Sequence, residues 1–388
     1  MLQRIEISAV QSLIDALRKL NYKVIGPTQR NGSIVYEEIT SANQLPQGWD
    51  AEQRPGFYRL RKRDDAAMFG YSVGPHSWKK FLFAPELTLF NALRHSKSFS
   101  LSNPGDGEKS RKAEKLAFLG VRSCELRAIE IQDKVFDGQQ YHDPHYRQVR
   151  EQLFMVAVNC SSPSETCFCS SMDTGPNISK PFDLALTEIC HADDHYFVVE
   201  SGSQRGENLL QGLKHRPATT QEVAQGEAVI ERARSLIKRK LDTRGIKELL
   251  YQNVDHPEWE KVGDRCLSCT NCTMVCPTCF CNTIEDSTDL AGSEAVRTRK
   301  WDSCFTMDFS YIHGGSIRSS TKARYRQWMT HKLASWIDQF GVSGCVGCGR
   351  CITWCPVGID ITDEARVIRE TNNGALFHVE KEINHGIP

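Results

Sequence analysis

The chain has 388 residues, a length that allows two domains or three, each with its own core. It carries 48 basic and 48 acidic residues, and the resulting net charge of zero argues against a nucleic-acid-binding protein, which needs an excess of Lys and Arg. No apolar run is long enough to span a membrane, and the opening segment MLQRIEISAVQSLIDALRKL lacks the apolar core of a secretory signal. We therefore expect a cytoplasmic protein without a membrane span.

The first half of the chain combines helical and strand patterns. Apolar positions at helical spacing predict a helix over residues 10–20, which Ser8 caps and Asn21 ends. A further helix is predicted over residues 123–136, directly after a strand. The predicted strands are 23–25, 33–39, 115–121, 154–158, 182–189 and 195–200. Residues 1–215 are thus predicted to form an α+β or α/β domain.

Two long helices are predicted in the second half. Thr219 and Glu222 form a capping-box motif before a helix that we expect to reach Leu241. Residues 216–258 are interpreted as a helical linker that contains this helix. The second long helix is predicted over residues 321–340, because its aromatic and aliphatic side chains recur at helical spacing.

The sixteen cysteines lie mainly in two groups, one over residues 124–169 and one over residues 266–355, while Cys190 stands apart. Dense disulfide frameworks belong to short secreted domains, whereas thiols clustered in a long cytosolic chain more often bind metal. The distribution therefore favours two metal-binding regions.

Two motifs of identical spacing, C-x2-C-x2-C-x3-C-P, begin at Cys266 and Cys345. Three thiolates on a tight loop can hold three corners of a 4Fe–4S cluster, and we expect the fourth cysteine to begin a helix and bind the other cluster. Structural zinc, the alternative, has no use for the third CxxC step or the trailing proline. The expected ligand sets are Cys266, Cys269, Cys272 and Cys355 for one cluster, and Cys345, Cys348, Cys351 and Cys276 for the other.

Both motifs lie in residues 259–388, which we expect to form a mostly helical, ferredoxin-like domain. An insertion over residues 277–344 separates them and contains three further cysteines, Cys279, Cys281 and Cys304. Two interpretations stay open for these thiols. Either they pack beside the clusters as structural groups, or they form an additional redox or metal site whose fourth position a His, a water or a substrate fills.

The upstream cysteines have irregular spacing. Cys124 starts a predicted helix, Cys160 ends an apolar strand, and Cys167 and Cys169 follow in a loop rich in Ser and Pro. Loops at strand ends converge in an α/β fold, and a helix N-terminus favours an anionic thiolate, so the four residues are candidate ligands of a third 4Fe–4S cluster. The competing interpretation is a set of buried thiols with a Cys167/Cys169 redox pair.

Five segments carry a resemblance to a known family: VRSCELRAIEIQDKVF, VNCSSPSETCFCSSMDTGP, CPTCFC, RKWDSCFTMDFSYIHGG and CVGCGRCITWCPVGIDI. In these segments the chain resembles the sulfhydrogenase β-subunit family, which includes the related electron-input component of anaerobic sulfite reductase. The resemblance implies a 4Fe–4S electron-transfer protein and a third cluster in the N-terminal domain. It also implies that the partner is a FAD- and NAD(P)-binding reductase subunit, with nickel–iron hydrogenase subunits beyond it. FAD, NAD(P) and any nickel–iron centre are expected on these partners, because the chain shows neither a NAD fingerprint nor nickel ligands.

The first functional hypothesis is therefore electron relay without acid–base catalysis, so no catalytic residue is nominated. Electron input to an anaerobic sulfite reductase is an alternative to the hydrogenase complex. Direct reduction of polysulfide or sulfur at the inserted cysteines is another, and a zinc-stabilised interaction module is a third. A basic group beside the second long helix, interpreted as either a docking patch or a solvated face, consists of Arg318, Lys322, Arg324 and Arg326.

Overall fold

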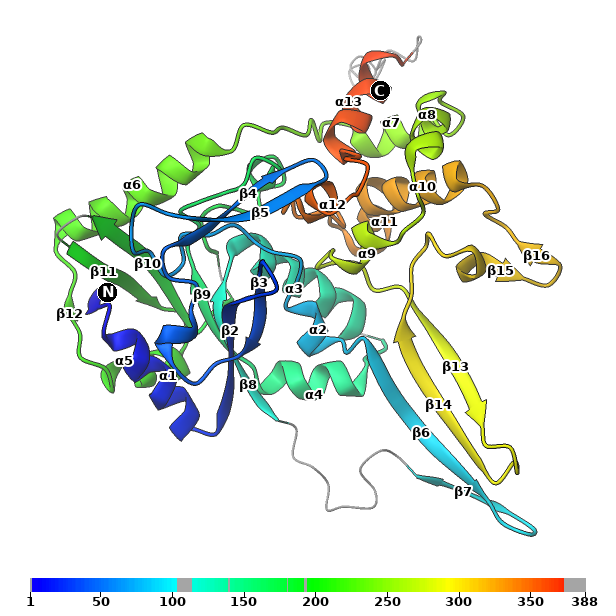
Figure 1. Cartoon of the computed structure of the whole chain (residues 1–388), viewed down its shortest axis with the longest axis horizontal. Helices are drawn as coiled ribbons and strands as arrows, with labels where there is room; N and C mark the ends of the chain where they lie inside the picture. The colour runs from blue at the N-terminus through cyan, green and yellow to red at the C-terminus, as the bar shows by residue number, and fades with distance from the viewer. Residues whose placement is uncertain (1, 103–113, 139, 180, 192–193, 373–388) are drawn as a thin grey trace, which may run out of the picture.

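A mixed eight-stranded sheet forms the centre of the N-terminal region (Figure 1). The computed structural model describes residues 2–102, 114–138, 140–179, 181–191 and 194–372. Strand order is β12-β1-β11-β10-β9-β8-β2-β3, and the neighbours from β2 through β8 and β9 to β10 are parallel, whereas the outer pairs are antiparallel. The strands are β1 (Gln3–Glu6), β2 (Tyr22–Arg30), β3 (Ser33–Glu38), β8 (Lys115–Val121), β9 (Phe154–Val158), β10 (Leu184–His191), β11 (Asp194–Ser201) and β12 (Arg216–Pro217).

Helices cover both faces of this sheet. Helices α1 (Ala9–Lys19) and α5 (Gln204–Gln211) pack on one face, and α3 (Ser123–Phe136) and α4 (Pro144–Gln152) pack on the other. Apart from Lys115 at the start of β8, strands β8 and β9 are apolar because alternate side chains enter a core on each face, as expected for parallel strands with two buried faces. The predicted helices and strands of this region are present, and the fold is a mixed α/β architecture.

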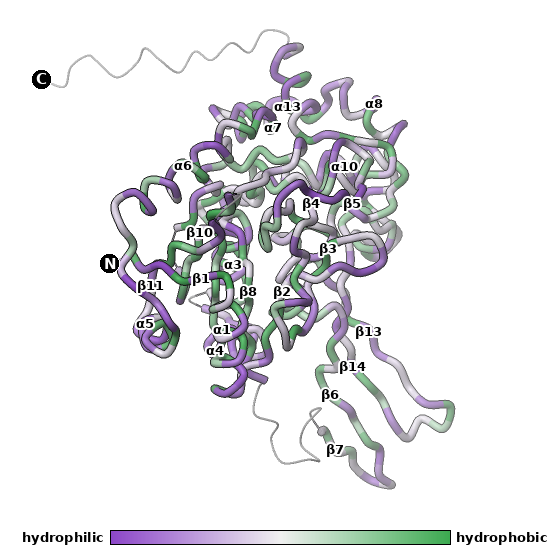
Figure 2. Tube along the Cα trace, turned by 60° about the vertical axis from the view of Figure 1, so that its left-hand side comes forward, coloured by the Kyte–Doolittle hydropathy of each residue, from purple (hydrophilic) through white to green (hydrophobic). Residues whose placement is uncertain are grey.

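A four-stranded antiparallel sheet projects from the body (Figure 1). Its order is β13-β14-β6-β7, with β6 (Glu86–Arg94) and β7 (Phe99–Ser102) from the first half of the chain and β13 (Asn282–Thr288) and β14 (Glu294–Trp301) from the insertion. The insertion is therefore built around a hairpin, although the sequence favoured a mostly helical domain. Figure 2 shows hydrophobic and hydrophilic stretches alternating along these projecting strands.

Short helices surround the cysteine motifs in the C-terminal region. A π turn over residues 331–335 joins α10 to α11, so the predicted long helix is present with one irregular turn, and Gly341 ends it at a φ of 70°. The helices are α7 (Ile246–Gln252), α8 (Glu258–Arg265), α9 (Asn271–Met274), α10 (Thr321–Thr330), α11 (Trp336–Phe340), α12 (Arg350–Thr353) and α13 (Ile361–Glu370). Two more small hairpins, β4 (Trp49–Arg54) with β5 (Phe57–Lys62) and β15 (Tyr311–Ile312) with β16 (Gly315–Ser316), and the short α2 (Lys79–Leu82) complete the elements that position the sites.

Helix α6 (Thr220–Leu236) connects the two regions across one side of the sheet (Figure 1). Its capping box is present, because the Thr219 hydroxyl accepts from the Glu222 amide and the Glu222 carboxylate accepts from the Thr219 amide. The helix ends at Leu236, so the expected continuation to Leu241 was wrong. The chain becomes extended there, and Ile237 and Leu241 are instead buried singly in two different apolar clusters. Among the described residues, no helix has the length and apolar character needed to cross a membrane.

Candidate iron–sulfur sites

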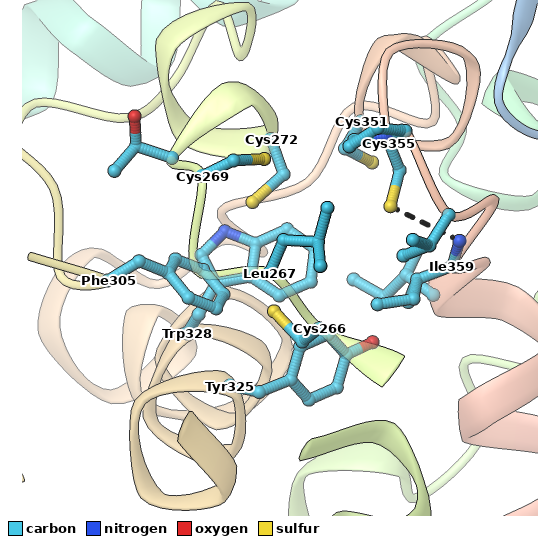
Figure 3. Close-up of a pocket in the computed structure, with 14 residues that line it drawn as sticks. Cys266, Leu267, Cys269, Cys272, Phe305, Tyr325, Trp328, Cys351, Cys355 and Ile359 are labelled. Atoms are coloured by element: carbon cyan, nitrogen blue, oxygen red, sulfur yellow. Dashed lines mark hydrogen bonds between the residues drawn. The ribbon is translucent and has the colours of Figure 1, made fainter. Parts of the chain in front are cut away.

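The first predicted set of cysteines lines a single cavity. Cys266, Cys269, Cys272 and Cys355 surround this space, which measures about 460 Å³ and is partly continuous with solvent (Figure 3). Cys266 follows α8, the next two flank and begin the short α9, and Cys355 comes from the far motif after α12. The fold thus brings a cysteine of the second motif to the loop of the first, which is the exchange expected of two-cluster ferredoxins.

Backbone amides and aromatic rings shape this first site. Ser268 and Thr270 have positive φ values of 49° and 68°, so the loop is wound tightly enough to turn its thiols inward. The Ser268 amide donates to Cys266 Sγ at 3.4 Å, and the Ile359 amide donates to Cys355 Sγ at 3.3 Å (Figure 3). The rings of Phe305, Tyr325 and Trp328 form the apolar wall of the cavity. Such amide donors and apolar walls set the potential of a bound cluster.

The second set lies deeper in the molecule. Burial raises the pKa of Cys351, and the nearby charges of Cys345, Cys348 and Cys276 raise it further, so these four thiols lie close together. Here too the fourth cysteine comes from the other motif. The fourth cysteines of both motifs follow the short helices α9 and α12, so the expectation that they begin a helix was wrong. Each of these cysteines follows its short helix and precedes a proline. The chain therefore leaves the helix at this point, and the cysteine lies near the site of the other motif.

A buried lysine accompanies the second set. Lys332, in the π turn, places Nζ 3.3 Å from Cys276 Sγ, 3.1 Å from Thr278 Oγ1 and 3.1 Å from the Gly344 carbonyl oxygen. Burial opposes the charge of Lys332, but the thiolates of Cys276 and Cys279 outweigh it and raise the pKa of the lysine. A fixed cation beside thiolates favours their deprotonated, metal-binding form. This role of Lys332 was not predicted from the sequence, because the residue lies in the long helix with no motif around it.

The four upstream cysteines line another cavity, of about 390 Å³. Cys124 lies at the start of α3 after β8, Cys160 follows β9, and Cys167 and Cys169 lie in the next loop. Because β8 and β9 are parallel neighbours, their carboxyl ends meet at the same edge of the sheet and bring the two loops together. Cys348 of the second set also lines this cavity.

Tight backbone contacts join the upstream loop to the second motif. The Phe168 amide donates to the Gly347 carbonyl at 2.8 Å, and the Thr174 hydroxyl donates to the Val346 carbonyl at 2.6 Å. A Cβ on Gly347 would lie 2.7 Å from the Cys169 backbone, so only glycine permits this approach.

An interior ion pair joins the same two regions. Arg350 lies between Cys348 and Cys351, and Glu125 follows Cys124, and both side chains are 0% exposed. Their guanidinium and carboxylate are in direct contact. Glu125 also accepts from Tyr36 Oη at 2.9 Å and Trp78 Nε1 at 3.0 Å. The Arg350 guanidinium also donates from Nε to the Gly74 carbonyl at 2.9 Å, and its Nη1 has no partner among the described protein atoms.

Four thiolates around a cavity are the donor set of a cuboidal cluster, and amides point at the sulfur atoms. In the described ranges, no group of three or more His, Cys, Asp or Glu residues has an arrangement that could hold a single metal ion. The comparison with protein families matches residues 265–359 to the 4Fe-4S dicluster domain. The chain contains a 4Fe–4S dicluster domain.

The similarity extends well beyond the dicluster domain. The chain is 28% identical over 357 residues to Sulfhydrogenase 2 subunit beta of Pyrococcus furiosus, and the alignment spans 91% of this chain and 93% of that protein. The resemblance to the sulfhydrogenase β-subunit family is thereby confirmed. No solved structure matches the chain significantly.

The three inserted cysteines of the dicluster domain do not form one group. The thiol of Cys276 raises the pKa of Cys279, and the Cys279 carbonyl accepts from Lys79 Nζ at 3.1 Å. Cys281 is instead affected by Cys304, which lowers the pKa of the Cys281 thiol to about 7, and Cys281 in turn raises the pKa of Cys304.

The basic group beside α10 is not a free cationic patch. Arg324 is buried and donates to the carbonyl oxygens of Arg318 and Ser319 and to Ser268 Oγ, so it supports the loop of the first site. Lys322 pairs with Glu260, and Arg326 donates to the Val254 carbonyl. The docking-patch interpretation therefore fails for Arg324, because its guanidinium is used inside the molecule.

Proposed function

We propose that this chain is the iron–sulfur electron-transfer subunit of a multi-subunit oxidoreductase of the sulfhydrogenase type. The observation that carries the proposal is the continuity of the three cysteine sets. Cys351 belongs to the second set and lines the cavity of the first, while Cys348 belongs to the second set and lines the cavity of the third. Adjacent sets thus share a wall, as a relay of one-electron centres requires.

In this proposal the ligands are Cys266, Cys269, Cys272 and Cys355 for the first cluster, Cys345, Cys348, Cys351 and Cys276 for the second, and Cys124, Cys160, Cys167 and Cys169 for the third. A bound 4Fe–4S cluster supplies reversible one-electron transfer. The protein contributes amide hydrogen bonds to the sulfur ligands and the buried charges of Lys332 and Arg350. Both cations offset the negative charge of the thiolates, and this favours the reduced state.

The first site is the best candidate for exchange with a partner. Cys269 is exposed, Leu267 beside it is 63% exposed, and Val357 at the same rim is also exposed. The upstream set, by contrast, has three of its four cysteines buried. We infer that a FAD- and NAD(P)-binding reductase subunit docks over the first site. We also infer that nickel–iron hydrogenase subunits are further members of the complex; the relative's name supports only that such a chain is one subunit of a sulfhydrogenase.

The test is reduction of the purified complex by NADH or NADPH under anaerobic conditions. The proposal expects loss of the broad cluster absorbance on addition of nucleotide, and a Leu267→Asp variant that keeps its iron but is reduced about tenfold more slowly, because a buried charge weakens the apolar contact. Val254→Asp, at a similarly exposed position away from the first site, is the control. Reduction of Leu267→Asp at the unmodified rate would contradict docking at this rim.

The same relay also suits electron input to an anaerobic sulfite reductase. The two assignments differ in what the purified complex does with its electrons. Hydrogen-dependent reduction of NAD(P) supports the hydrogenase type, whereas NAD(P)H-dependent reduction of sulfite supports the alternative.

A further inference from the structure

Two buried hydrogen-bond donors in the wall of the first site have no partners. Tyr325 and Trp328 lie three residues apart on α10, so they share one face of this helix. Both side chains are buried, and both line the cavity that the first cysteine set surrounds. Tyr325 Oη and Trp328 Nε1 make no hydrogen bond to any described protein atom. Buried polar groups in folded proteins are almost always paired, because an unpaired one has lost its bond to water without a replacement.

The packing of the aromatic wall fixes where these donors lie. The Trp328 ring centroid is 5.5 Å from that of Tyr325 and 6.0 Å from that of Phe305, so the three rings hold one another in place. In Figure 3 the indole nitrogen of Trp328 lies on the edge of its ring that faces the side chains of Cys269 and Cys272. An indole N–H can only donate, so it needs an acceptor at this wall.

Sulfur atoms are the acceptors that this cavity can offer. Apart from Tyr325, Trp328 and Thr270, the described residues that line it carry only thiol or apolar side chains. The remaining acceptors are the thiolate sulfurs and the sulfides of a bound 4Fe–4S cluster. The two unpaired donors therefore fit a cluster at this site, and they add a polar function to a wall that is otherwise apolar.

We propose that Tyr325 and Trp328 donate hydrogen bonds to the sulfur atoms of the first cluster and thereby raise its reduction potential. This inference rests on the proposed electron-transfer function. Reduction adds one negative charge to a cluster, and hydrogen-bond donors to sulfur stabilise the more negative state. An apolar wall without donors has the opposite effect, because burial disfavours added charge. The two residues thus make the exposed end of the relay easier to reduce.

Substitution by phenylalanine tests this role, because it removes each donor and keeps an aromatic ring in the wall. The purified holoprotein is titrated with redox mediators under anaerobic conditions, and electron paramagnetic resonance follows the reduced clusters. For Tyr325→Phe and Trp328→Phe we expect the ratio of reduced to oxidised first cluster at a fixed potential to fall about tenfold. This change is a shift of about 59 mV to lower potential for a one-electron couple. The other cluster couples should not move.

Trp259→Phe is the matched control. Trp259 packs in the same apolar cluster, but it does not line the cavity, and its Nε1 donates to the Asn253 carbonyl at 2.7 Å. This variant also loses an indole N–H, and its cluster potentials should equal those of the unmodified chain. Iron content is measured on every variant to establish that the clusters are retained. If Trp328→Phe loses iron, Tyr325→Phe decides the test, because it removes a single oxygen atom.

A spectroscopic measurement separates a lost hydrogen bond from a change in the shape of the wall. Electron–nuclear double resonance of the reduced chain, compared in light and heavy water, detects exchangeable protons coupled to a cluster. We expect Tyr325→Phe to lose one such coupling and Trp259→Phe to keep them all.

These results separate the two proposals. Full iron content with unchanged potentials in both variants of the wall would overturn the donor role and leave the relay intact, and so would a shift to higher potential. A chain whose clusters dithionite does not reduce contradicts the relay itself, and the donor role with it.

Discussion

The first cysteine set and the upstream set reach similar cavities by different routes. Three cysteines of the first come from one loop, where the C-x2-C-x2-C spacing keeps them close together. The upstream set is assembled from two strand ends and a loop, so it exists only because β8 and β9 are parallel neighbours. Cys269 of the first set is exposed, whereas three of the four upstream cysteines are buried. Local spacing therefore builds the more exposed end of the proposed relay, and tertiary structure builds the more buried end.

The largest expected effect concerns the ion pair that joins these regions. Arg350→Met leaves Glu125 charged and unpaired in the interior, where such a change costs about 3–5 kcal/mol. We expect a large fall in the thermal unfolding temperature of the holoprotein. Adding Glu125→Gln removes the unpaired charge and should restore much of the lost stability.

Arg366→Met provides the matched control, because Arg366 makes ion pairs only on the exposed face of α13. Its effect should stay within about 0.5 kcal/mol. If Arg350→Met unfolds at the same temperature as this control, the two regions are not held together by the pair.

A smaller effect is expected at the glycine where the upstream loop meets the second motif. Gly347→Ala must accommodate a φ of 63° and a Cβ at 2.7 Å from the Cys169 backbone. The new methyl group should displace Cys169, so both stability and iron content should fall. Gly341→Ala has a φ of 70° with open space around it, so it loses only about 1–2 kcal/mol through backbone strain and keeps its iron. Equal iron contents in the two variants would contradict the role of this contact.

The smallest effect lies in the connection between the regions. Thr219→Ala removes the hydroxyl that accepts from the Glu222 amide, and should lower the free energy of unfolding by about 1 kcal/mol. Thr220→Ala, one residue inside α6, keeps the cap and should be near neutral. Neither variant should change the iron content. Loss of iron from Thr219→Ala would mean that α6 positions a cluster ligand.

Much of the sheet was predictable because β8, α3 and β9 have strong local patterns. The regular motifs likewise predicted the first and second ligand sets, which remain predictions until iron is measured. Contacts between distant segments were not predictable. Glu125 and Arg350 are separated by 225 positions, and the pairing of β14 with β6 joins similarly remote strands. No local preference encodes such contacts, since they depend on the packing of the whole chain. The end of α6 was missed for the same reason, because Ile237 leaves helical geometry to reach a tertiary cluster.

The most direct test of the relay is the number of iron and acid-labile sulfide atoms per chain, measured on anaerobically purified protein. We predict about twelve of each, and about eight in Cys124→Ser, which loses only the upstream cluster. About eight of each in the unmodified chain would contradict a third cluster and leave only the dicluster domain to carry electrons.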